Sequence, residues 1–452
     1  MKVTAVLLAA GQGTRMNTAL PKVLHPLAGK PMLWHVLQAL VGVTTEKPLV
    51  VVGHEAERVE AFVGESARCV RQEPQLGTGH AVMQAVPYLK GKTDYVIVAY
   101  ADMPLLRAEV FRQLVDTQVK NSGPLSMLTV LADDPRGFGR VVRKEDGTVG
   151  AIVEEYVATP EQLQIRELNV GAYCFSAEWL WEALERIELS PKGEYYLTDT
   201  VALAAKEGRA VQALVHTEPA ETIGINTRVH LAEAEVAMRW RINRDLMLTG
   251  VTMVDPSSTY IDAGVRVGRD TIIMPNTFLQ GNTSVGEGCE IGPGSLLRDS
   301  QVGAGCKVLM SVMEGAVLDD DVDIGPFARL RKGAHLGEGV HMGNFGEVKD
   351  SYLGPGVKMG HFSYIGNATV GANTNIGAGT ITCNYDGEQK HPTEIGEDAF
   401  IGSDTMLVAP LKIGKRARTG SGAVVTKDVP DDSLAVGMPA RVIRKLRKRD
   451  PS

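Results

Sequence analysis

The chain has 452 residues, with 47 Lys and Arg against 54 Asp and Glu, and its formal net charge of −7 argues against a general affinity for nucleic acid. The five cysteines are scattered and never form a Cys-x-x-Cys pair, which argues against a zinc ribbon or a disulfide framework and favours the reducing cytoplasm. No apolar run approaches the roughly 20 residues of a membrane helix, so we expect a soluble chain without membrane insertion.

The first half of the chain alternates short apolar runs with helical patterns. Residues 3–8, 49–52 and 95–99 have the length and composition of buried strands, whereas residues 32–40 and 108–119 repeat apolar side chains at a helical period. This rhythm predicts an α/β domain with a Rossmann-like, mostly parallel sheet. Ligands of such sheets bind at the carboxyl ends of the strands.

A glycine-rich turn, Gly11-Gln-Gly-Thr-Arg-Met16, follows the first predicted strand, and Pro21-Lys22 comes shortly after it. The backbone N–H groups of such a turn can surround phosphate groups, and Arg15 and Lys22 add fixed positive charge. The turn has neither the Gly-Lys-Ser/Thr of a P-loop nor the Gly-x-Gly-x-x-Gly of a dinucleotide fold. It therefore indicates a phosphate site of another kind.

Asp102 follows the strand predicted over residues 95–101. A carboxylate at the end of a parallel strand is well placed to present Mg²⁺ to phosphate groups. An aspartate that starts a turn before Pro104 explains the same position equally well.

Residues 228–249 lack Gly and Pro and place apolar side chains at a helical period, and Gly250 then ends the pattern. We expect a long helix that joins two domains of different composition. Of the 49 glycines, 18 precede residue 231 and 31 follow it. The predicted boundaries are 1–227 for the α/β domain, 228–249 for the linker helix and 250–452 for the second domain, which ends in a basic tail.

A period of six residues governs the second domain. Apolar residues recur in two unbroken series, Val267, Ile273, Leu279, Val285, Ile291 and Leu297, then Leu318, Ile324, Leu330, Leu336, Met342 and Val348. A hexapeptide period predicts a parallel β-helix, in which each hexapeptide forms one flat face and one corner of a triangular coil.

Three irregularities point to chemistry in this coil. Arg331 and Lys349 are 18 residues apart, which is one full turn, so two cations would stack and repel unless an anion such as a sugar phosphate lay between them. His361 is a candidate base for acyl transfer from a thioester to an amine, although a lone surface or core histidine is commoner. Residues 381–394 interrupt the repeat and should project as a loop on the binding face.

Further motifs follow the glycine-rich turn in order. They are Gln72-x-x-Gln-Leu-Gly-Thr-Gly-His-Ala81, Tyr100-Ala-Asp-Met-Pro104, Gly137-Phe-Gly-Arg140, Ile152-Val-Glu154, Glu167-Leu-Asn-Val-Gly171 and Gly193-Glu-Tyr-Tyr-Leu-Thr-Asp199. Together with the hexapeptide half, the chain resembles the family of bifunctional N-acetylglucosamine-1-phosphate uridylyltransferases and glucosamine-1-phosphate acetyltransferases over nearly its whole length. The resemblance implies a left-handed β-helix.

For the α/β domain, the resemblance implies a uridylyltransferase site with Arg15 and Lys22 as catalytic cations and with Asp102 and Asn226 as Mg²⁺ ligands. The residues implied for uracil and ribose are Leu8, Ala9, Ala10, Gly11, Gln72, Gly77 and Thr78, and those for the sugar are Gly139, Glu154 and Asn169. Tyr100 and Ala101 complete this set. The family more often has Gly at position 101, and we expect only a local adjustment to the extra methyl group.

For the β-helix, the resemblance implies that Arg331 and Lys349 hold the sugar phosphate and that Glu347 orients His361 as the base. The other residues implied for the sugar, the acyl group and acetyl-CoA are Tyr364, Asn375, Ala378, Asn384, Tyr385, Ser403 and Ser421. Residues 435–441 depart from the family pattern, so the contact to the acetyl-CoA phosphates falls to Arg441, Arg444 or Lys445, although residues 441–449 suit a basic, solvated terminal helix equally well. The family's homotrimer is also implied.

These features predict a cytoplasmic enzyme that acetylates glucosamine 1-phosphate with acetyl-CoA and then couples N-acetylglucosamine 1-phosphate with UTP, giving UDP-N-acetylglucosamine and pyrophosphate. The product would feed cell-envelope polysaccharides such as peptidoglycan and lipopolysaccharide. The alternative is a sugar-1-phosphate nucleotidyltransferase of single function with a regulatory or trimerising β-helix.

Overall fold

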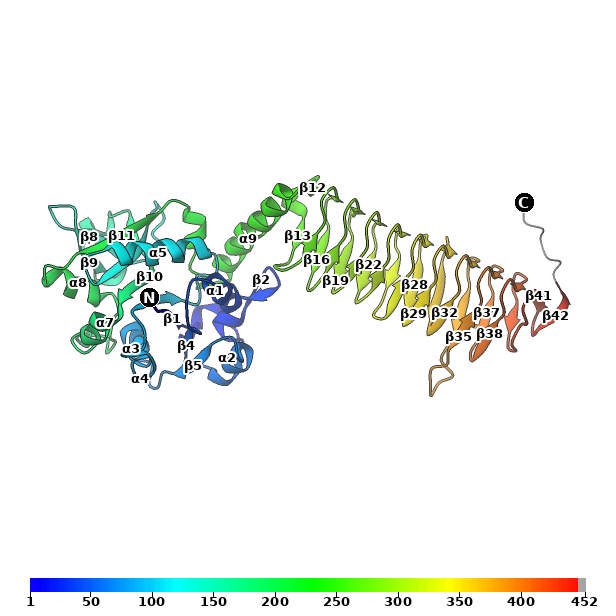
Figure 1. The fold of residues 1–452 in the computed structure, drawn as a ribbon, viewed down its shortest axis with the longest axis horizontal. Coiled ribbons are helices and arrows are strands. Elements are labelled where there is room, and N and C mark those ends of the chain that lie inside the picture. Colours follow the sequence, from blue (N-terminus) through cyan, green and yellow to red (C-terminus); the bar gives the residue numbers. More distant parts are fainter. Residues whose placement is uncertain (446–452) are drawn as a thin grey trace. The chain divides into compact units, whose positions relative to one another are not determined.

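The structure is a computed structural model that describes residues 1–445. Contacts divide the chain into two compact units between Met238 and Arg239, which lie within helix α9 (Arg228–Leu248). The helix predicted over residues 228–249 is present, whereas the domain boundaries at its two ends stay predictions. Figure 1 shows the first unit in blue to green and the stacked strands of the second in green to red.

A nine-stranded sheet forms the centre of the first unit. Its main path runs in the order β11 (Val211–His216), β7 (Leu125–Leu131), β10 (Glu167–Ser176), β6 (Tyr95–Tyr100), β1 (Val3–Leu8), β4 (Leu49–Val52) and β5 (Arg68–Arg71). β6, β1, β4 and β5 are parallel, β10 is antiparallel to both neighbours, and the hairpin of β8 (Arg140–Arg143) and β9 (Val149–Val153) joins through β10. The sheet is mostly parallel, as predicted.

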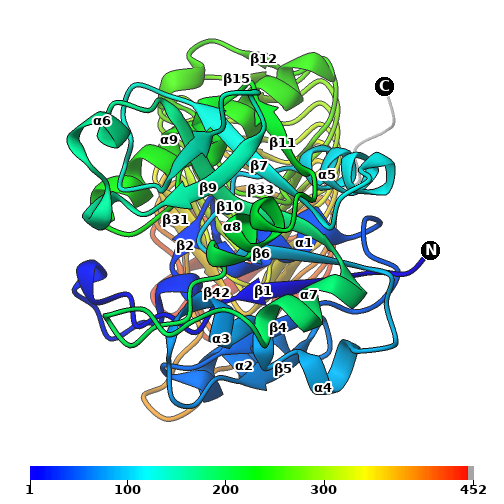
Figure 2. The same ribbon diagram turned by 90° about the vertical axis from the view of Figure 1, so that its left-hand side faces the viewer.

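Helices cover both faces of this sheet, which explains why its inner strands are apolar throughout. Successive side chains of a strand point to opposite faces, so Val50 and Val52 join one core while Leu49 and Val51 join the other. The first core contains α1 (Met32–Leu40), α2 (Ala56–Val63) and α5 (Ala108–Lys120), and the second contains α3 (Gly77–Met83), α7 (Ala177–Leu184) and α8 (Asp199–Lys206). Figure 1 shows α3 and α7 on one side of β1 and β4 and α1 and α2 on the other, and Figure 2 looks onto the sheet from the side of α7.

The second unit is a left-handed β-helix of short parallel strands in three sheets of 12, 10 and 9 strands. One continuous core of buried apolar residues fills the coil. The predicted series stack with their own members one turn later, for example Leu279 on Leu297 and Leu330 on Val348. Some turns are shorter than three hexapeptides, since Leu297 stacks on Met313 and Met342 stacks on Met359. The period is therefore less regular than the sequence suggested.

The second part of α9 closes the start of the coil. Ile242, Leu246 and Met247 pack against the β-helix core, and the Asn243 side chain donates hydrogen bonds to the carbonyl oxygens of Pro256 (2.9 Å) and Thr259 (3.0 Å). These contacts satisfy backbone groups that the first turn of a coil would otherwise leave without partners.

The end of the coil differs from one expectation. Residues 441–445 lie in strand β42 (Ala440–Lys445), which pairs antiparallel with β41 (Ser433–Gly437), so the terminal helix is wrong for this part of the chain. Pairing with β41 gives these basic residues backbone hydrogen bonds and leaves their side chains exposed. The rest of the expected helix, residues 446–449, lies outside the described residues.

All five cysteines are free. In residues 1–445, helices that combine the length and the apolar character needed to cross a membrane are absent.

Candidate functional sites

The glycine-rich turn and the ends of β1 and β6 border a cleft of about 670 Å³ in the first unit. Its walls bring together residues that are far apart in the sequence, namely Leu8, Ala9, Ala10, Gly11, Arg15, Lys22, Gln72, Gly77, Thr78, Tyr100 and Asp102. Ala101 is fully buried, and its N–H donates to the carbonyl of Leu8 (3.1 Å). The carboxyl ends of adjacent parallel strands thus meet at the predicted edge of the sheet.

A smaller cavity of about 170 Å³ shares Tyr100 and Asp102 with this cleft and is also lined by Gly139, Glu154, Asn169 and Asn226. All the residues predicted for the sugar line it. A sugar phosphate here would lie beside a nucleotide in the larger cleft.

Lys22 connects the two predicted metal ligands. Its Nζ donates to Asp102 Oδ2 (2.5 Å) and to Asn226 Oδ1 (3.0 Å), and the N–H of Ile225 donates to the carbonyl of Asp102 (3.0 Å). Gly13 permits this approach, because it has φ +62° and a Cβ there would lie 2.7 Å from Lys22 Cβ. Two oxygen donors already converge on one positive charge, which is the donor chemistry that Mg²⁺ prefers.

Glu154 and Asn169 are held at the base of the smaller cavity. Thr198 Oγ1 donates to Glu154 Oε1 (3.2 Å), and Asn169 Nδ2 donates to the hydroxyl of Tyr173 (2.7 Å). Burial raises the pKa of the Glu154 carboxyl above its ordinary value, and the hydrogen bond from Thr198 partly offsets this effect.

Gln72 and Thr78 take part in the walls of the nucleotide cleft. Gln72 Nε2 donates to the carbonyl of Gly77 (2.9 Å), and Thr78 Oγ1 accepts a hydrogen bond from the N–H of Leu197 (3.0 Å). Gln75, which was not assigned a role from sequence, donates to the carbonyl of Ala10 (2.6 Å) and so ties this wall to the glycine-rich turn.

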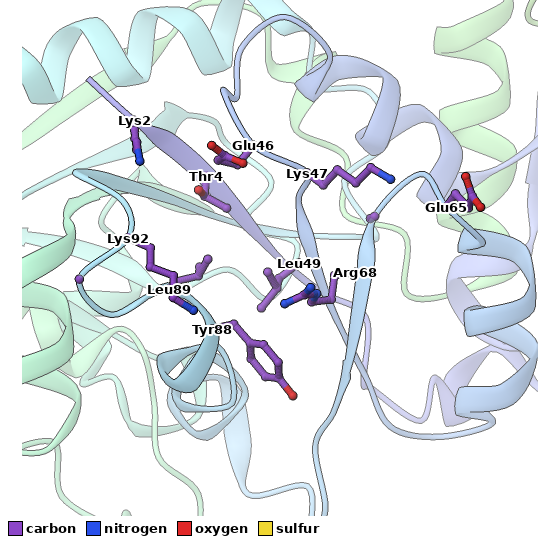
Figure 3. Close-up of a pocket in the computed structure, with 12 residues that line it drawn as sticks. Lys2, Thr4, Glu46, Lys47, Leu49, Glu65, Arg68, Tyr88, Leu89 and Lys92 are labelled. Atoms are coloured by element: carbon purple, nitrogen blue, oxygen red, sulfur yellow. The ribbon is translucent and has the colours of Figure 1, made fainter.

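A separate cavity of about 730 Å³ lies at the amino ends of β1, β4 and β5, where Lys2, Leu49, Arg68 and Tyr88 line it (Figure 3). It is larger than the nucleotide cleft, yet none of its lining residues belongs to the predicted motifs. Ligands of parallel sheets bind at the opposite, carboxyl edge. We therefore place the chemistry in the cleft beside Asp102.

In the β-helix, β25 (Arg329–Leu330), β28 (Gly346–Lys349) and β31 (Ser363–Gly366) are neighbours in one sheet. This order brings Arg331, Glu347, Lys349 and Tyr364 together on adjacent turns. Arg331 Nη1 donates to Glu347 Oε1 (2.9 Å). This hydrogen bond joins Glu347 to Arg331 rather than to His361, so the orientation of His361 by Glu347 stays a prediction.

Lys390 is a cation that the sequence analysis missed. It lies at the end of the loop between β34 (Ile381–Cys383) and β35 (Thr393–Ile395), and it approaches Lys349 closely enough to lower the pKa of the Lys349 ammonium, with a further contribution from Arg331. Lys349 therefore lies near two further cations, Arg331 and Lys390. The loop has no period, so the sequence carried no signal for this contact.

His361, Ala378, Ser403 and Ser421 form a column along one corner of the coil. The N–H of Gly379 donates to the carbonyl of Phe362, that of Asp404 to Ala378 and that of Gly422 to Ser403. The sequence spacings along this column are unequal because the loop lengthens one turn. His361 is exposed, whereas Asn375 lies on β33 (Asn375–Ile376), in the neighbouring sheet from Tyr364.

The 381–394 loop is folded on itself. Asn384 is buried and donates from Nδ2 to Asn367 Oδ1 (2.6 Å), whereas Tyr385 is exposed and forms a β-bridge with Lys390. Asp386 accepts hydrogen bonds from the N–H groups of Glu388 (2.8 Å) and Gln389 (2.7 Å). Arg441 lies on β42 opposite Val436, and its role toward acetyl-CoA stays a prediction.

Comparison with known proteins agrees with this geometry. The model of the MobA-like NTP transferase domain matches residues 5–190, and that of the bacterial transferase hexapeptide (six repeats) matches residues 264–299. Proteins named "Bifunctional protein GlmU" are similar over nearly the whole chain. The one from Geobacillus sp. (strain WCH70) is 45% identical, covering 98% of this chain and 97% of the relative. That from Heliobacterium modesticaldum is 47% identical, covering 96% and 95%.

The relative from Streptococcus equi subsp. zooepidemicus is 44% identical, covering 98% of this chain and 97% of its own length. The matched region extends over both units of the chain. The chain therefore belongs to the family of bifunctional GlmU proteins, the uridylyltransferase–acetyltransferases that its sequence resembles.

Proposed function

We propose that the two activities of this bifunctional enzyme reside in the two constellations described above, acetyl transfer in the β-helix and uridylyl transfer in the cleft beside Asp102. The observation that supports the assignment is that the residues predicted for uridylyl transfer line two adjoining cavities of the first unit, whereas Arg331, Glu347 and Lys349 lie together in the β-helix. Acetylation of glucosamine 1-phosphate comes first, and its product is the sugar substrate of the second site.

In the acetyl-transfer site, Arg331, Lys349 and Lys390 bind the sugar phosphate. The amine of glucosamine 1-phosphate attacks the thioester carbonyl of acetyl-CoA, the C–N bond forms, and the C–S bond breaks to release the CoA thiol. His361 takes the proton that the amine loses. His361 is exposed on the corner column, one turn from Ala378 and two turns from Ser403.

In the uridylyl-transfer site, an oxygen of the sugar phosphate attacks the α-phosphorus of UTP, and the bond to pyrophosphate breaks. Arg15 and Lys22 neutralise negative charge on the phosphate groups, and Glu154 and Asn169 orient the sugar. Asp102 and Asn226 would hold Mg²⁺, which supplies charge neutralisation at the phosphates when bound. The two oxygens that converge on Lys22 support this assignment.

The family also points to a homotrimer built through the β-helix, to a cytoplasmic location, and to a role in supplying UDP-N-acetylglucosamine for cell-envelope polysaccharides. We propose all three for this chain. Its five free cysteines agree with a reducing compartment.

The assignment predicts that the two activities can be removed separately. Asp102→Asn should lower pyrophosphate release from UTP by about 100-fold or more and leave acetylation unchanged, because it removes charge only beside the phosphates. His361→Ala should lower acetylation by roughly 100- to 10,000-fold and leave pyrophosphate release unchanged. Free-thiol release and pyrophosphate release, measured on the same preparations, check both expectations.

Asp116→Asn and His341→Ala are matched controls, since both residues are exposed and lie outside the two sets. Loss of both activities in a folded Asp102→Asn protein would contradict the assignment. Pyrophosphate release without any thiol release from the wild-type chain would support the single-function alternative.

A further inference from the structure

Residues 195–199, which we name the linking segment, contact both parts of the uridylyl-transfer site. On the nucleotide side, the N–H of Gly79 donates to the carbonyl of Tyr195 (2.7 Å), and the N–H of Tyr195 donates to the carbonyl of Leu76 (2.8 Å). The N–H of Leu197 donates to Thr78 Oγ1 (3.0 Å). Three hydrogen bonds thus fix the segment to the wall of the nucleotide cleft.

Two glycines in that wall are required by this contact. Gly77 has φ +93°, and a Cβ there would lie 2.7 Å from the carbonyl oxygen of Tyr195. A Cβ on Gly79 would lie 3.0 Å from the same oxygen. The Gly-Thr-Gly sequence therefore serves the close approach of the linking segment, in addition to lining the cleft.

On the sugar side, the linking segment holds Glu154. Thr198 is buried, and its hydroxyl donates to Glu154 Oε1 (3.2 Å). The hydroxyl of Tyr156 donates to that of Tyr196 (2.9 Å). The segment that contains Glu154 and Tyr156 is thus joined to the linking segment by two side-chain hydrogen bonds.

The hydroxyl of Thr198 does not cap a helix. Thr198 comes directly before α8 with a backbone that is already helical (φ −59°, ψ −24°), and its side chain makes no capping hydrogen bond. The hydroxyl donates to Glu154 instead, so its contact is to a residue of the proposed sugar site.

We propose that Thr198 is a positioning residue that holds Glu154 for the sugar, and that the linking segment couples sugar binding to nucleotide binding through Thr78. A nucleotide that orders Thr78 also orders Leu197, and the next residue then presents its hydroxyl to Glu154. The inference rests on the proposed function of this site.

The test compares three variants in the pyrophosphate assay. Thr198→Val removes the hydrogen bond at nearly constant volume and should raise KM for N-acetylglucosamine 1-phosphate about tenfold, with kcat changed less than about twofold. Thr198→Ser keeps the hydroxyl and should restore KM to within about threefold of wild type. Thr93→Val removes another buried hydroxyl, which donates to the carbonyl of Lys2, and should leave KM unchanged.

Coupling is measured separately, as the Kd of N-acetylglucosamine 1-phosphate with and without a non-hydrolysable UTP analogue. The analogue should tighten sugar binding to the wild type by about fivefold, and Thr198→Val should lose this gain. Acetylation by the same preparations reports that the chain is folded.

Three outcomes would overturn the inference. The first is a KM for the sugar phosphate that is the same in Thr198→Val and Thr93→Val. The second is a KM that is raised as much in Thr198→Ser as in Thr198→Val. The third is a wild-type Kd for the sugar phosphate that is the same with and without the analogue. A wild type that releases no pyrophosphate from these substrates would instead overturn the proposed function.

Discussion

Three cations, Arg331, Lys349 and Lys390, converge on one small region of the β-helix surface. Glu347 offsets the charge of Arg331, whereas Lys390 and Arg331 lower the pKa of Lys349 because like charges disfavour its ionised form. An anion between them would relieve this repulsion. The sequence predicted two of the three, because residues one turn apart must stack in a coil of known period.

Lys390→Met should raise KM for glucosamine 1-phosphate by about tenfold, since it removes one of three charges that face the phosphate. Thiol release at saturating acetyl-CoA measures this KM. Lys307→Met, an exposed lysine in another sheet of the coil, is the matched control. Equal KM values for the two variants would remove Lys390 from the phosphate site.

At the scale of elements, the loop between β34 and β35 owes its shape to Asp386. Its carboxylate accepts two backbone N–H groups and lies 2.6 Å from His391 Nε2. The pKa of Asp386 lies well below its ordinary value. The hydrogen bond from the N–H of Gln389 makes the largest contribution, and the one with His391 makes the second largest. A lowered pKa stabilises the loop above the unfolded pKa of about 3.9, and this contribution is lost only as pH falls through the lower, folded pKa.

Asp386→Ala should therefore raise KM for acetyl-CoA about three- to tenfold, because the loop must then be ordered on binding. Because Asp386 stays ionised between pH 8 and about pH 5, the loop should not loosen in this range, and loosening should not change the wild-type KM for acetyl-CoA. Thiol release at several pH values measures both. The control is Glu388→Ala, which keeps the backbone N–H that Asp386 accepts; an Asp386→Ala protein no different from it would contradict this account.

The sequence predicted elements wherever a period was strong. The strands at 3–8 and 49–52 and the helix at 32–40 have the predicted bounds, because burial fixes the apolar pattern. It could not predict the corner column of His361, Ala378 and Ser403, since the inserted loop changes the spacing along the chain. The sequence could not predict β42 either, because its basic residues suit a helix as well as an edge strand. Pairing with β41 determines that they form a strand.

For the whole molecule, the important feature is that the cores are separate. The β-helix core draws on residues after Val251, supplemented by side chains of α9, whereas the two cores of the α/β unit draw on residues before Ile225. Each unit thus buries its own apolar surface, and each proposed active site lies in one of them.

The separation predicts that heat should remove the two activities independently. Leu330→Ala empties a fully buried position in the β-helix and should cost about 2–5 kcal/mol, lowering the inactivation midpoint of acetylation by on the order of 10 °C while sparing uridylyl transfer. Leu114→Ala, equally buried in the α/β unit, should have the opposite effect. Residual activities after heating measure both, and joint loss in either variant would refute independent unfolding.

The antiparallel strand β42 has a consequence for the exposed edge at this end of the coil. A parallel coil ends in a row of free backbone N–H and carbonyl groups, which could template a second coil and so extend into a fibre. β42 covers β41 with a strand of opposite direction, and its side chains include Arg441, Arg444 and Lys445. Like charges on an outer strand repel another copy of the same strand, so β42 protects this edge of the coil from pairing with a second coil.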